Sequence, residues 1–380
     1  MKTTATAAEP TTGRYPRVLS VTTTFRAAEV TGPMAHVPGE TLVLDAEASP
    51  LRRVVEAARE TRRAIRRSRP DVLLLNGTGV GGFVAALVAW RYGVPLVPRL
   101  VGDPAAVTNR EAIARAQRRG PLALATTYGY VALSRAIFAL AVGFVTVSTP
   151  LAEATRDRRR LPPERVRAVP VPLTSEPRGD GTAIRERLGG DPTVVLTVTN
   201  LNFRGKYRGV LDTLAALQPS LEAHEDLVYV VAGDGAYREE LQAAVDERFG
   251  DSPARDRVHV EGYVDGVFDH YAAADLFCYL SYIDGYPNAV LEAQSMGLPV
   301  VANPAFGMLD MVRDGETGLL VDPHDPSSVA AAVERLLADP AERERLGEAA
   351  RRRVAEENDP AVVGSRLHDA LAGILAASGR

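Results

Sequence analysis

Cysteine is almost missing from this chain, which holds one, Cys278, among 380 residues. A single cysteine excludes an intrachain disulfide framework and any metal cluster that needs several thiolates. Such sparing use is typical of the reducing cytoplasm, where we expect the protein to work. No group of His, Asp and Glu has the spacing of metal ligands, and no Asp-x-Asp pair is present. We therefore expect no metal cofactor.

Targeting signals and long apolar runs are also lacking. The first fourteen residues, MKTTATAAEPTTGR, have no apolar centre of the kind that marks a signal peptide, and they predict a loose tail. Residues 121–149 carry little charge, but Arg135 lies in their middle, whereas a membrane span needs about 20 apolar residues. We expect a buried helix followed by a strand there. Neither a Gly-x-Ser-x-Gly elbow nor a Walker phosphate loop occurs.

The chain does have ample apolar material and an uneven charge. Hydrophobic residues make up 46% of the sequence, which excludes global disorder and permits a large core. Residues 1–175 hold 25 basic and 13 acidic side chains, a net charge of +12, and residues 176–380 hold 19 and 35, a net charge of −16. This asymmetry suggests an anionic surface or acceptor near the first half. Arg-rich helices with solvated outer faces are an equally good interpretation.

Short apolar runs alternate with helical patterns, which is typical of parallel sheets covered on both faces. The expected strands of the first half are 17–23, 41–44, 71–75, 95–100, 144–148 and 166–169, with helices at 51–68, 82–92 and a long one ending near 140. Those of the second half are 193–199, 227–233, 258–260, 276–280, 299–303 and 318–321, with helices at 208–217, 237–249, 287–296 and 326–338. Residues 169–181, rich in Pro and Gly, predict a linker. The fold class is therefore α/β, with two doubly wound domains.

A glycine-rich turn, Gly77-x-Gly79-x-x-Gly82, follows the third expected strand. The spelling matches a dinucleotide-binding motif, but that motif normally follows the first strand and has an acidic residue about 20 positions on. Asp103 lies 21 residues after Gly82, in a loop past the end of the next strand. The motif is half satisfied, so an oxidoreductase that binds a dinucleotide at Gly77–Gly82 stays an alternative.

The stretch Ser281–Asp322 is the most informative. An apolar strand ends before the loop of Asp284, and Pro287 suits the first turn of a helix. Free backbone N–H groups at such a helix end can bind a phosphate or a hydroxyl-rich anion. Asp284 lies in the loop, and Glu292 lies eight residues on, in the first turns of the helix. Carboxylates accept several hydrogen bonds and donate none, which suits sugar and ribose hydroxyls.

The run DGYPNAVLEAQSMGLPVVA, Asp284–Ala302, resembles the motif of the retaining nucleotide-sugar glycosyltransferases of family 4. The continuation DGETGLLVDPHD, Asp314–Asp325, is also similar, and the resemblance extends from about Leu196 to Leu337. It implies the GT-B fold, in which two Rossmann-like doubly wound domains face a cleft. We expect an acceptor-side domain at 1–174, a nucleotide-sugar domain at 175–360, and a C-terminal helix at 361–380 that crosses back to the first domain.

The resemblance also implies roles for single residues. Glu292 would bind the ribose hydroxyls, and Asp284 would touch the donor sugar near the reacting carbon. Asp284 stands where the family more often has Glu, so its reach is one methylene shorter. The backbone of Gly285, Tyr286, Pro287 and Asn288 would cradle the sugar or the diphosphate, and Tyr263 and Val264 would meet the base.

The loop TNLNFRGKYRG, Thr199–Gly209, resembles the family's diphosphate clamp, although Asn200 stands where an Arg is usual. We expect Lys206 to be the phosphate cation, with Arg204 or Arg208 as its partner. Cations there neutralise the charge that builds on the leaving diphosphate, in place of Mg²⁺. A solvated basic loop is the alternative.

The first domain lacks the His that family members often place near the donor sugar. The corresponding loop, Pro98–Val107, carries Gly102-Asp103 instead. Asp103 is the candidate base for an acceptor hydroxyl, and a helix N-cap is an equally good interpretation. We expect Gly79, Gly81 and Arg99 on the acceptor side.

These residues imply transfer of a sugar from a nucleotide-diphosphate donor to an acceptor hydroxyl of a glycan, lipid or small molecule, in glycoconjugate or polysaccharide synthesis. A subunit that binds the donor without turning it over is an alternative, given the short Asp284 and the missing His. Seven arginines between Arg52 and Arg67 load one helix, and anionic membranes attract such segments. Contact with the inner face of a membrane is thus a further hypothesis, beside simple solubility. Nucleic acid is not an expected partner.

Overall fold

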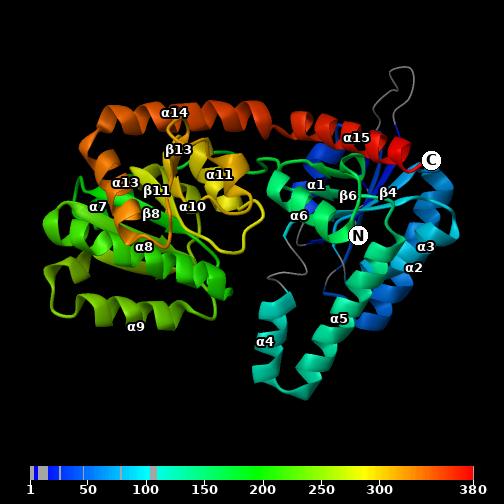
Figure 1. The fold of residues 1–380 in the computed structure, drawn as a ribbon, viewed down its shortest axis with the longest axis horizontal. Helices are drawn as coiled ribbons and strands as arrows, with labels where there is room; N and C mark the ends of the chain where they lie inside the picture. Colours follow the sequence, from blue (N-terminus) through cyan, green and yellow to red (C-terminus); the bar gives the residue numbers. More distant parts are fainter. Residues whose placement is uncertain are drawn as a thin grey trace. The chain divides into compact units, whose positions relative to one another are not determined.

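The computed structural model describes residues 4–6, 16–24, 27–45, 47–77, 79–102 and 109–379. The chain divides into two compact units. Figure 1 shows the chain coloured along its sequence, from blue at the N-terminus to red at the C-terminus. Unit 1 consists of Met1–Thr174 and Glu357–Arg380, and unit 2 consists of Ser175–Glu356. Each unit has its own sheet and its own hydrophobic core, so the units are described separately.

Unit 1 is built on a seven-stranded sheet with the order β1-β3-β2-β4-β5-β6-β7. Only the edge strand β1 is antiparallel to its neighbour. Counted along the chain from β2, the parallel strands have the order 2-1-3-4-5-6, so the direction of winding changes between β2 and β4. The strands are β1 (Thr4–Thr6), β2 (Val18–Thr23), β3 (Gly39–Leu44), β4 (Val72–Leu75), β5 (Leu96–Leu100), β6 (Phe144–Thr146) and β7 (Val166–Ala168).

Helices cover this sheet, and the last helix of the chain is one of them. Val363, Leu371 and Ile374 of the last helix join Val18 and Val72 of the strands in the core of unit 1. The helices are α1 (Ala27–Met34), α2 (Pro50–Ser68), α3 (Val80–Arg91), α4 (Asn109–Arg119), α5 (Pro121–Leu140), α6 (Thr149–Arg159) and α15 (Pro360–Ala377).

Helix α5 is a correction to the sequence analysis. The helix and the following strand β6 are confirmed, but the helix is not buried along its length. Its first half is exposed, including Leu122 and Tyr128, and the buried residues lie from Val131 onward. In Figure 1, α4 and α5 form a hairpin in which the first half of α5 extends away from the sheet. Among the described residues, α5 is the one helix long and apolar enough to cross a membrane.

Unit 2 is built on a six-stranded parallel sheet with the order β10-β9-β8-β11-β12-β13. Along the chain this is 3-2-1-4-5-6, the order of dinucleotide-binding domains, with the switch point between β8 and β11. The strands are β8 (Thr193–Val198), β9 (Leu227–Ala232), β10 (Val258–Gly262), β11 (Leu276–Tyr279), β12 (Val300–Ala302) and β13 (Gly318–Leu320). All twelve strands expected from the sequence are present, with bounds that differ by at most two residues.

The helices of unit 2 match the expected ones at α9, α11 and α13, whereas α8 is twice as long as expected. Pro219 lies inside α8 without ending it, and α8 buries a stripe of residues from Gly205 to Leu221. The helices are α7 (Thr182–Arg187), α8 (Arg204–Ala223), α9 (Arg238–Phe249), α10 (Val267–Ala273), α11 (Asn288–Ser295), α12 (Met308–Met311), α13 (Pro326–Ala338) and α14 (Pro340–Glu357).

The return from unit 2 to unit 1 comes earlier than the expected boundary at 361. The side chain of Asn358 donates to the Val171 carbonyl at 2.7 Å, and the Leu173 amide donates to the Asn358 carbonyl at 2.8 Å. These bonds join residues directly after α14 to the segment that follows β7. Residues 357–360 therefore belong to unit 1.

Candidate active site

The loops after β8 and β11 meet at the switch point of the unit 2 sheet. Lys206, in the first turn of α8, lies 3.0 Å from Asp284 in the loop after β11, measured from Nζ to Oδ1. Both side chains are about 15% exposed, so the pair is shielded but still open to solvent on one side. Switch points are where doubly wound sheets bind their ligands. The structure thus brings together two residues that stand 78 positions apart in the sequence.

The two glycines that flank Lys206 make this approach possible. A Cβ at Gly209 would lie 1.7 Å from the Leu280 carbonyl oxygen, and one at Gly205 would lie 2.6 Å from Cγ2 of Ile283. Real Cβ atoms do not come so close, so any other residue would push α8 away from the loop after β11. Glycine weakens a helix interior by about 1 kcal/mol relative to alanine. That loss is offset here by close packing, which places Lys206 beside Asp284.

Asp284 is held by three donors. Besides Lys206, the hydroxyl groups of Tyr279 and Ser281 donate to its Oδ2 at 2.8 and 2.6 Å. Burial, followed by the nearby Asp284 carboxylate, raises the pKa of Tyr279 well above its ordinary value, so the phenol stays a donor. Asn303 fixes Ser281 in turn, with hydrogen bonds to its backbone amide and carbonyl at 2.8 and 2.9 Å. The carboxylate is therefore oriented before any ligand arrives.

Glu292 is the second acidic group of the site. Its Oε2 lies 3.1 Å from the hydroxyl of Tyr271, a buried side chain of α10. Burial raises the pKa of Glu292 above its ordinary value of 4.5, and the hydrogen bond from Tyr271 acts in the opposite direction. The second oxygen, Oε1, has no partner among the residues that the structure describes. Glu292 can accept further hydrogen bonds there from a ligand's hydroxyls.

Lys206 is chemically unusual in this chain. Of the 44 basic residues only Lys2 and Lys206 are lysines, and all others are arginines. An ammonium group is compact and has three donors, one of which the pair with Asp284 uses. Two donors remain for an anion, and within the described ranges no other contact occupies them.

The other donor-side residues take varied positions. Arg204 is exposed at the start of α8, and Arg208 lies 4.6 Å above the ring of Tyr282 and 3.6 Å from Asp212. The hydroxyl of Tyr282 also donates to Asp212, and burial together with this bond raises the pKa of Tyr282 to about 12. Arg208 is therefore already engaged in a cluster of its own, while Arg204 is the more available guanidinium.

The loop after β11 and the end of β10 carry the remaining positions. Gly285 is buried, because the Gly307 backbone packs so closely that a Cβ on Gly307 would lie 1.9 Å from the Gly285 carbonyl oxygen. The loop continues through Tyr286 and Pro287 to Asn288, the first residue of α11. Tyr263 and Val264 follow β10 at the carboxyl edge of the sheet, with Tyr263 75% exposed.

Sequence reasoning missed four residues that hold the acidic pair: Tyr271, Tyr279, Ser281 and Asn303. Tyr279 carries a hydroxyl inside an otherwise apolar strand, and Asn303 directly follows the next strand, so both were visible as polar groups near strand ends. Tyr271 had no such signal, because a helix turn of α10 looks like ordinary core.

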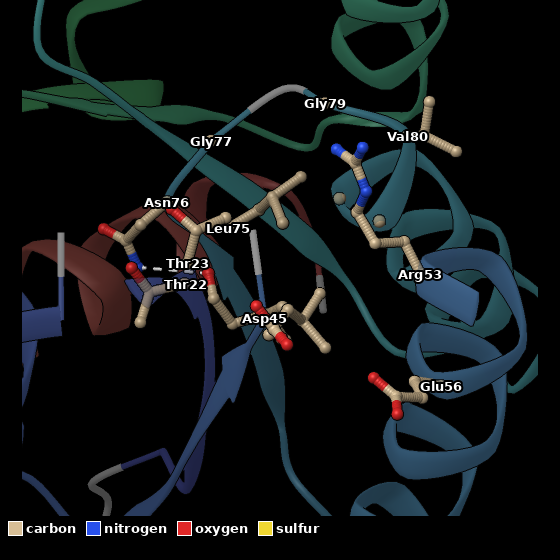
Figure 2. A pocket seen from close by; sticks show the side chains of 14 residues that line it. Thr22, Thr23, Asp45, Arg53, Glu56, Leu75, Asn76, Gly77, Gly79 and Val80 are labelled. Atoms are coloured by element: carbon tan, nitrogen blue, oxygen red, sulfur yellow. Dashed lines mark hydrogen bonds between the residues drawn. The ribbon is translucent and has the colours of Figure 1, made fainter. Parts of the chain in front are cut away.

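Unit 1 has a pocket at its own switch point, where β2, β3 and β4 end (Figure 2). Its cavity volume is about 70 Å³, smaller than the roughly 300–1,000 Å³ of most small-molecule sites, so it would hold only part of a ligand. Asp45 follows β3, and Arg53 and Glu56 come from α2. The hydroxyl of Thr22 and Oδ1 of Asn76 are buried with no hydrogen-bond partner in the described part of the chain. Buried polar groups are normally paired, so these two oxygens stand out in the wall of the pocket.

Gly79 and Gly81, expected on the acceptor side, line this pocket together with Gly77 and Gly82. Gly77 has a φ of +124°, which side chains rarely adopt, and a Cβ on Gly82 would lie 2.6 Å from the Gly77 carbonyl oxygen. The glycines thus form a tight turn between β4 and α3. The turn follows the third parallel strand and not the first, so the dinucleotide motif stays incomplete.

Arg99 does not line this pocket. It is 8% exposed, contacts the Pro170 carbonyl at 3.4 Å, and lies beside a smaller cavity that shares Asn76. Asp103, the candidate base, lies outside the described residues. Among those that are described, no group of three or more His, Cys, Asp or Glu side chains could hold a metal ion.

Comparisons with known proteins connect unit 2 to one enzyme family. Residues 183–353 match the family model described as glycosyl transferases group 1. This range contains Lys206, Asp284 and Glu292, and it lies entirely within unit 2. Unit 2 is thus related in sequence to glycosyltransferases.

Curated relatives are also glycosyltransferases by name. The alpha-D-kanosaminyltransferase of Streptomyces kanamyceticus is 30% identical over 201 residues, which cover 51% of this chain and 50% of the relative. A D-inositol 3-phosphate glycosyltransferase of Acidothermus cellulolyticus is 30% identical over 279 residues, which cover 70% and 59%. The chain thus spans between half and three fifths of the length of these two relatives.

Solved structures match almost the whole chain. The complex of HepE from Anabaena with UDP has a TM-score of 0.67 at 16% identity and covers 94% of this chain and 99% of its own. Sucrose-phosphate synthase from Thermosynechococcus elongatus has a TM-score of 0.64 at 20% identity and covers 95% and 100%. Likeness at such identities shows the fold, and the expected architecture of two Rossmann-like units of the GT-B kind is confirmed.

Proposed function

We propose that this chain is a retaining glycosyltransferase of family 4, which moves a sugar from a nucleotide-diphosphate donor to an acceptor hydroxyl. One observation carries the proposal. The pair Lys206–Asp284 and the carboxylate of Glu292 lie in loops and helix starts at the carboxyl edge of one sheet, inside the region that matches the glycosyl transferases group 1 model.

Each group then has a chemical task on the donor. Lys206 directs two unused N–H donors at the diphosphate and neutralises the charge that grows on it as the sugar leaves. Asp284, already oriented by Tyr279 and Ser281, accepts from hydroxyls of the sugar. Glu292 accepts from the ribose through its unpaired oxygen, and the exposed Arg204 adds a second cation at the start of α8.

The donor nucleotide is most simply a uridine diphosphate. The solved structures of the Anabaena relative HepE contain UDP and UDP-glucose, in a chain of the same fold. In this scheme Tyr263, which is exposed after β10, stacks on the base, and the neighbouring Val264 offers its backbone. No metal is needed in this scheme, because Lys206 and the start of α8 supply the positive charge.

The acceptor site is the pocket of unit 1. Asp45 and Glu56 accept hydrogen bonds, Arg53 donates, and the unpaired Thr22 and Asn76 oxygens complete a lining suited to a molecule with several hydroxyls. Arg52 pairs with Glu56 at 2.8 Å, so the carboxylates and guanidinium groups here balance in charge, which suits a neutral acceptor with hydroxyl groups.

A direct test combines turnover with labelling of lysine. Incubation with a panel of UDP-, GDP-, ADP- and TDP-sugars should release one nucleoside diphosphate, and NMR of the product should show an unchanged anomeric configuration. An amine-reactive probe followed by peptide mass spectrometry should label Lys206 less when the donor is present, and Lys2 equally in both samples. If Lys206 is labelled to the same extent with and without each donor, its assignment to the diphosphate is wrong.

The same experiment separates catalysis from binding alone. The short Asp284 favours, as a second candidate, a subunit that holds the donor but never cleaves it. In such a protein, bound donor would protect Lys206 from labelling, and the nucleotide would raise the melting temperature of the protein. No acceptor, however, would lead to release of nucleoside diphosphate. Release of diphosphate that depends on an acceptor excludes this alternative.

A further inference from the structure

Helices α2 and α3 of unit 1 form a face that the proposed reaction does not use. The two helices pack against each other, and an open groove runs between them. Its apolar lining includes Val54 and Val55 of α2 and Leu87 of α3, which are 36%, 55% and 40% exposed. Soluble proteins rarely leave such side chains exposed side by side without a partner.

Two larger apolar side chains on the same two helices are also exposed. Leu51, in the first turn of α2, is 75% exposed, and Trp90, near the end of α3, is 64% exposed. Trp90 is the only tryptophan of the chain. Of the twelve large apolar side chains that stand exposed among the described residues, ten belong to unit 1 and seven of these to α2, α3 and the residue after it.

Arginines surround the apolar strip. Arg59, Arg62 and Arg66 of α2 and Arg91 of α3 line the groove, and none of the four has an acidic partner within the described ranges. By contrast, Arg52 pairs with Glu56 at 2.8 Å on the same helix. Cζ of Arg66 lies 5.8 Å from the centre of the Tyr92 ring, and both side chains line the groove. Exposed apolar side chains together with guanidinium groups that lack an acidic partner are typical of helices that lie in a membrane interface.

We propose that the α2–α3 face docks unit 1 on a membrane surface that contains anionic phospholipid. Arg59, Arg62, Arg66 and Arg91 bind the phosphate groups, while Leu51, Val55 and Trp90 enter the boundary between headgroups and acyl chains. A second copy of the chain is a poor occupant, because the two faces would bring eight unpaired arginines together. A soluble polyanion would engage the arginines but leave Trp90 and Leu51 in water.

Tryptophan fluorescence provides the test, because Trp90 is the sole reporter. The full chain is mixed with phosphatidylcholine vesicles with and without phosphatidylglycerol, and binding is measured by sedimentation. We expect binding to the anionic vesicles only, with a shift of Trp90 emission to shorter wavelength and quenching by brominated lipid. Each basic side chain near such a surface strengthens partitioning about fivefold, so Arg62→Gln/Arg66→Gln should weaken it roughly 30-fold.

The control variant Arg248→Gln/Arg352→Gln removes the same charge from exposed positions of unit 2 and should bind as the parent does. Circular dichroism confirms that both variants fold. Binding that is absent, that persists in Arg62→Gln/Arg66→Gln, or that leaves Trp90 emission unchanged overturns the proposal. Equal binding to a soluble polyanion such as heparin, without an emission shift, identifies another partner and also overturns it. Donor turnover on a water-soluble acceptor is independent of all these outcomes.

Discussion

The pocket of unit 1 and the site of unit 2 occupy the same place in two similar sheets, yet their polar groups differ. In unit 2 a lysine pairs with Asp284, which two hydroxyls already orient, and Glu292 adds a second carboxylate that the Tyr271 hydroxyl holds. In unit 1 two carboxylates and one guanidinium surround buried oxygens of Thr22 and Asn76 that have no partner among the described residues. In unit 2 the two spare N–H donors of Lys206 suit an anion, whereas in unit 1 the carboxylates suit hydroxyl groups. The comparison teaches that one architecture hosts two ligand chemistries through a few side chains at strand ends.

The largest effect on turnover is expected from substitution of Lys206, the cation that distinguishes the site of unit 2. Lys206→Ala removes the charge that faces the leaving diphosphate, and turnover should fall about 10²–10³-fold, as on loss of a preorganised transition-state donor. Steady-state release of nucleoside diphosphate measures this. Lys206→Arg should keep part of the parent's rate. The control Arg248→Ala, an exposed change in the same unit, should keep the full rate. A fall of less than threefold for Lys206→Ala would remove the cation from the mechanism.

Asp45 tests the other side of the comparison. Asp45→Asn keeps the shape of the pocket but replaces a charged carboxylate by a neutral amide. Hydrogen bonds from substrate hydroxyls to a charged group are worth about 1.5–3 kcal/mol, so they weaken. The KM for the acceptor should rise about 10- to 100-fold while the Kd for the nucleotide stays unchanged. Titrations of each substrate separate the two constants. A change in nucleotide affinity instead would mean that the pocket of unit 1 serves the donor.

Glu292 sharpens the comparison through pH. Its pKa is raised by burial, so acidification protonates it above pH 4.5 and removes the acceptor for the ribose. Nucleotide affinity should fall about tenfold as the pH drops through that raised pKa, and Glu292→Gln should be uniformly weaker with no such pH dependence. Calorimetric titration over a pH series measures both. A parallel pH dependence in the variant would assign the effect to another group.

The same raised pKa predicts a change in the stability of the unligated protein. The contribution of protonated Glu292 is complete below its ordinary pKa of 4.5 and is lost as the pH rises through the raised value. At neutral pH, Glu292→Gln should therefore melt slightly higher than the parent without nucleotide, by a few degrees at most. Calorimetry of both proteins at neutral and acidic pH checks the sign. A lower melting temperature at neutral pH would contradict it.

The smallest expected effect is that of metal removal. If Lys206 supplies the charge on the diphosphate, treatment with EDTA should leave turnover within a factor of two, and Mg²⁺ should not rescue Lys206→Ala. Activity that disappears on chelation and returns with Mg²⁺ would show that a metal shares this task.

The sequence alone predicted most of the strands and helices, and it indicated the candidate site residues of unit 2. Alternating apolar runs predicted all twelve parallel strands, because strands buried on both faces have no polar side to obscure the pattern. The spacing of Asp284 and Glu292 around a strand, a proline and a helix start indicated a site from local signals only. In contrast, α8 was predicted too short, since the reason for its glycines lies in residues 280 and 283, far along the chain.

Only the tertiary structure decided which side chains share a site. The pairing of Lys206 with Asp284 depends on the order in which β8 and β11 lie in the sheet. The unpaired oxygens of Thr22 and Asn76, and the exposure of Trp90, depend on what packs around them. The sequence determined the strands, the turns and the candidate charges because these follow from local patterns. Partners, pockets and exposed faces follow from contacts between distant segments, which no local pattern encodes.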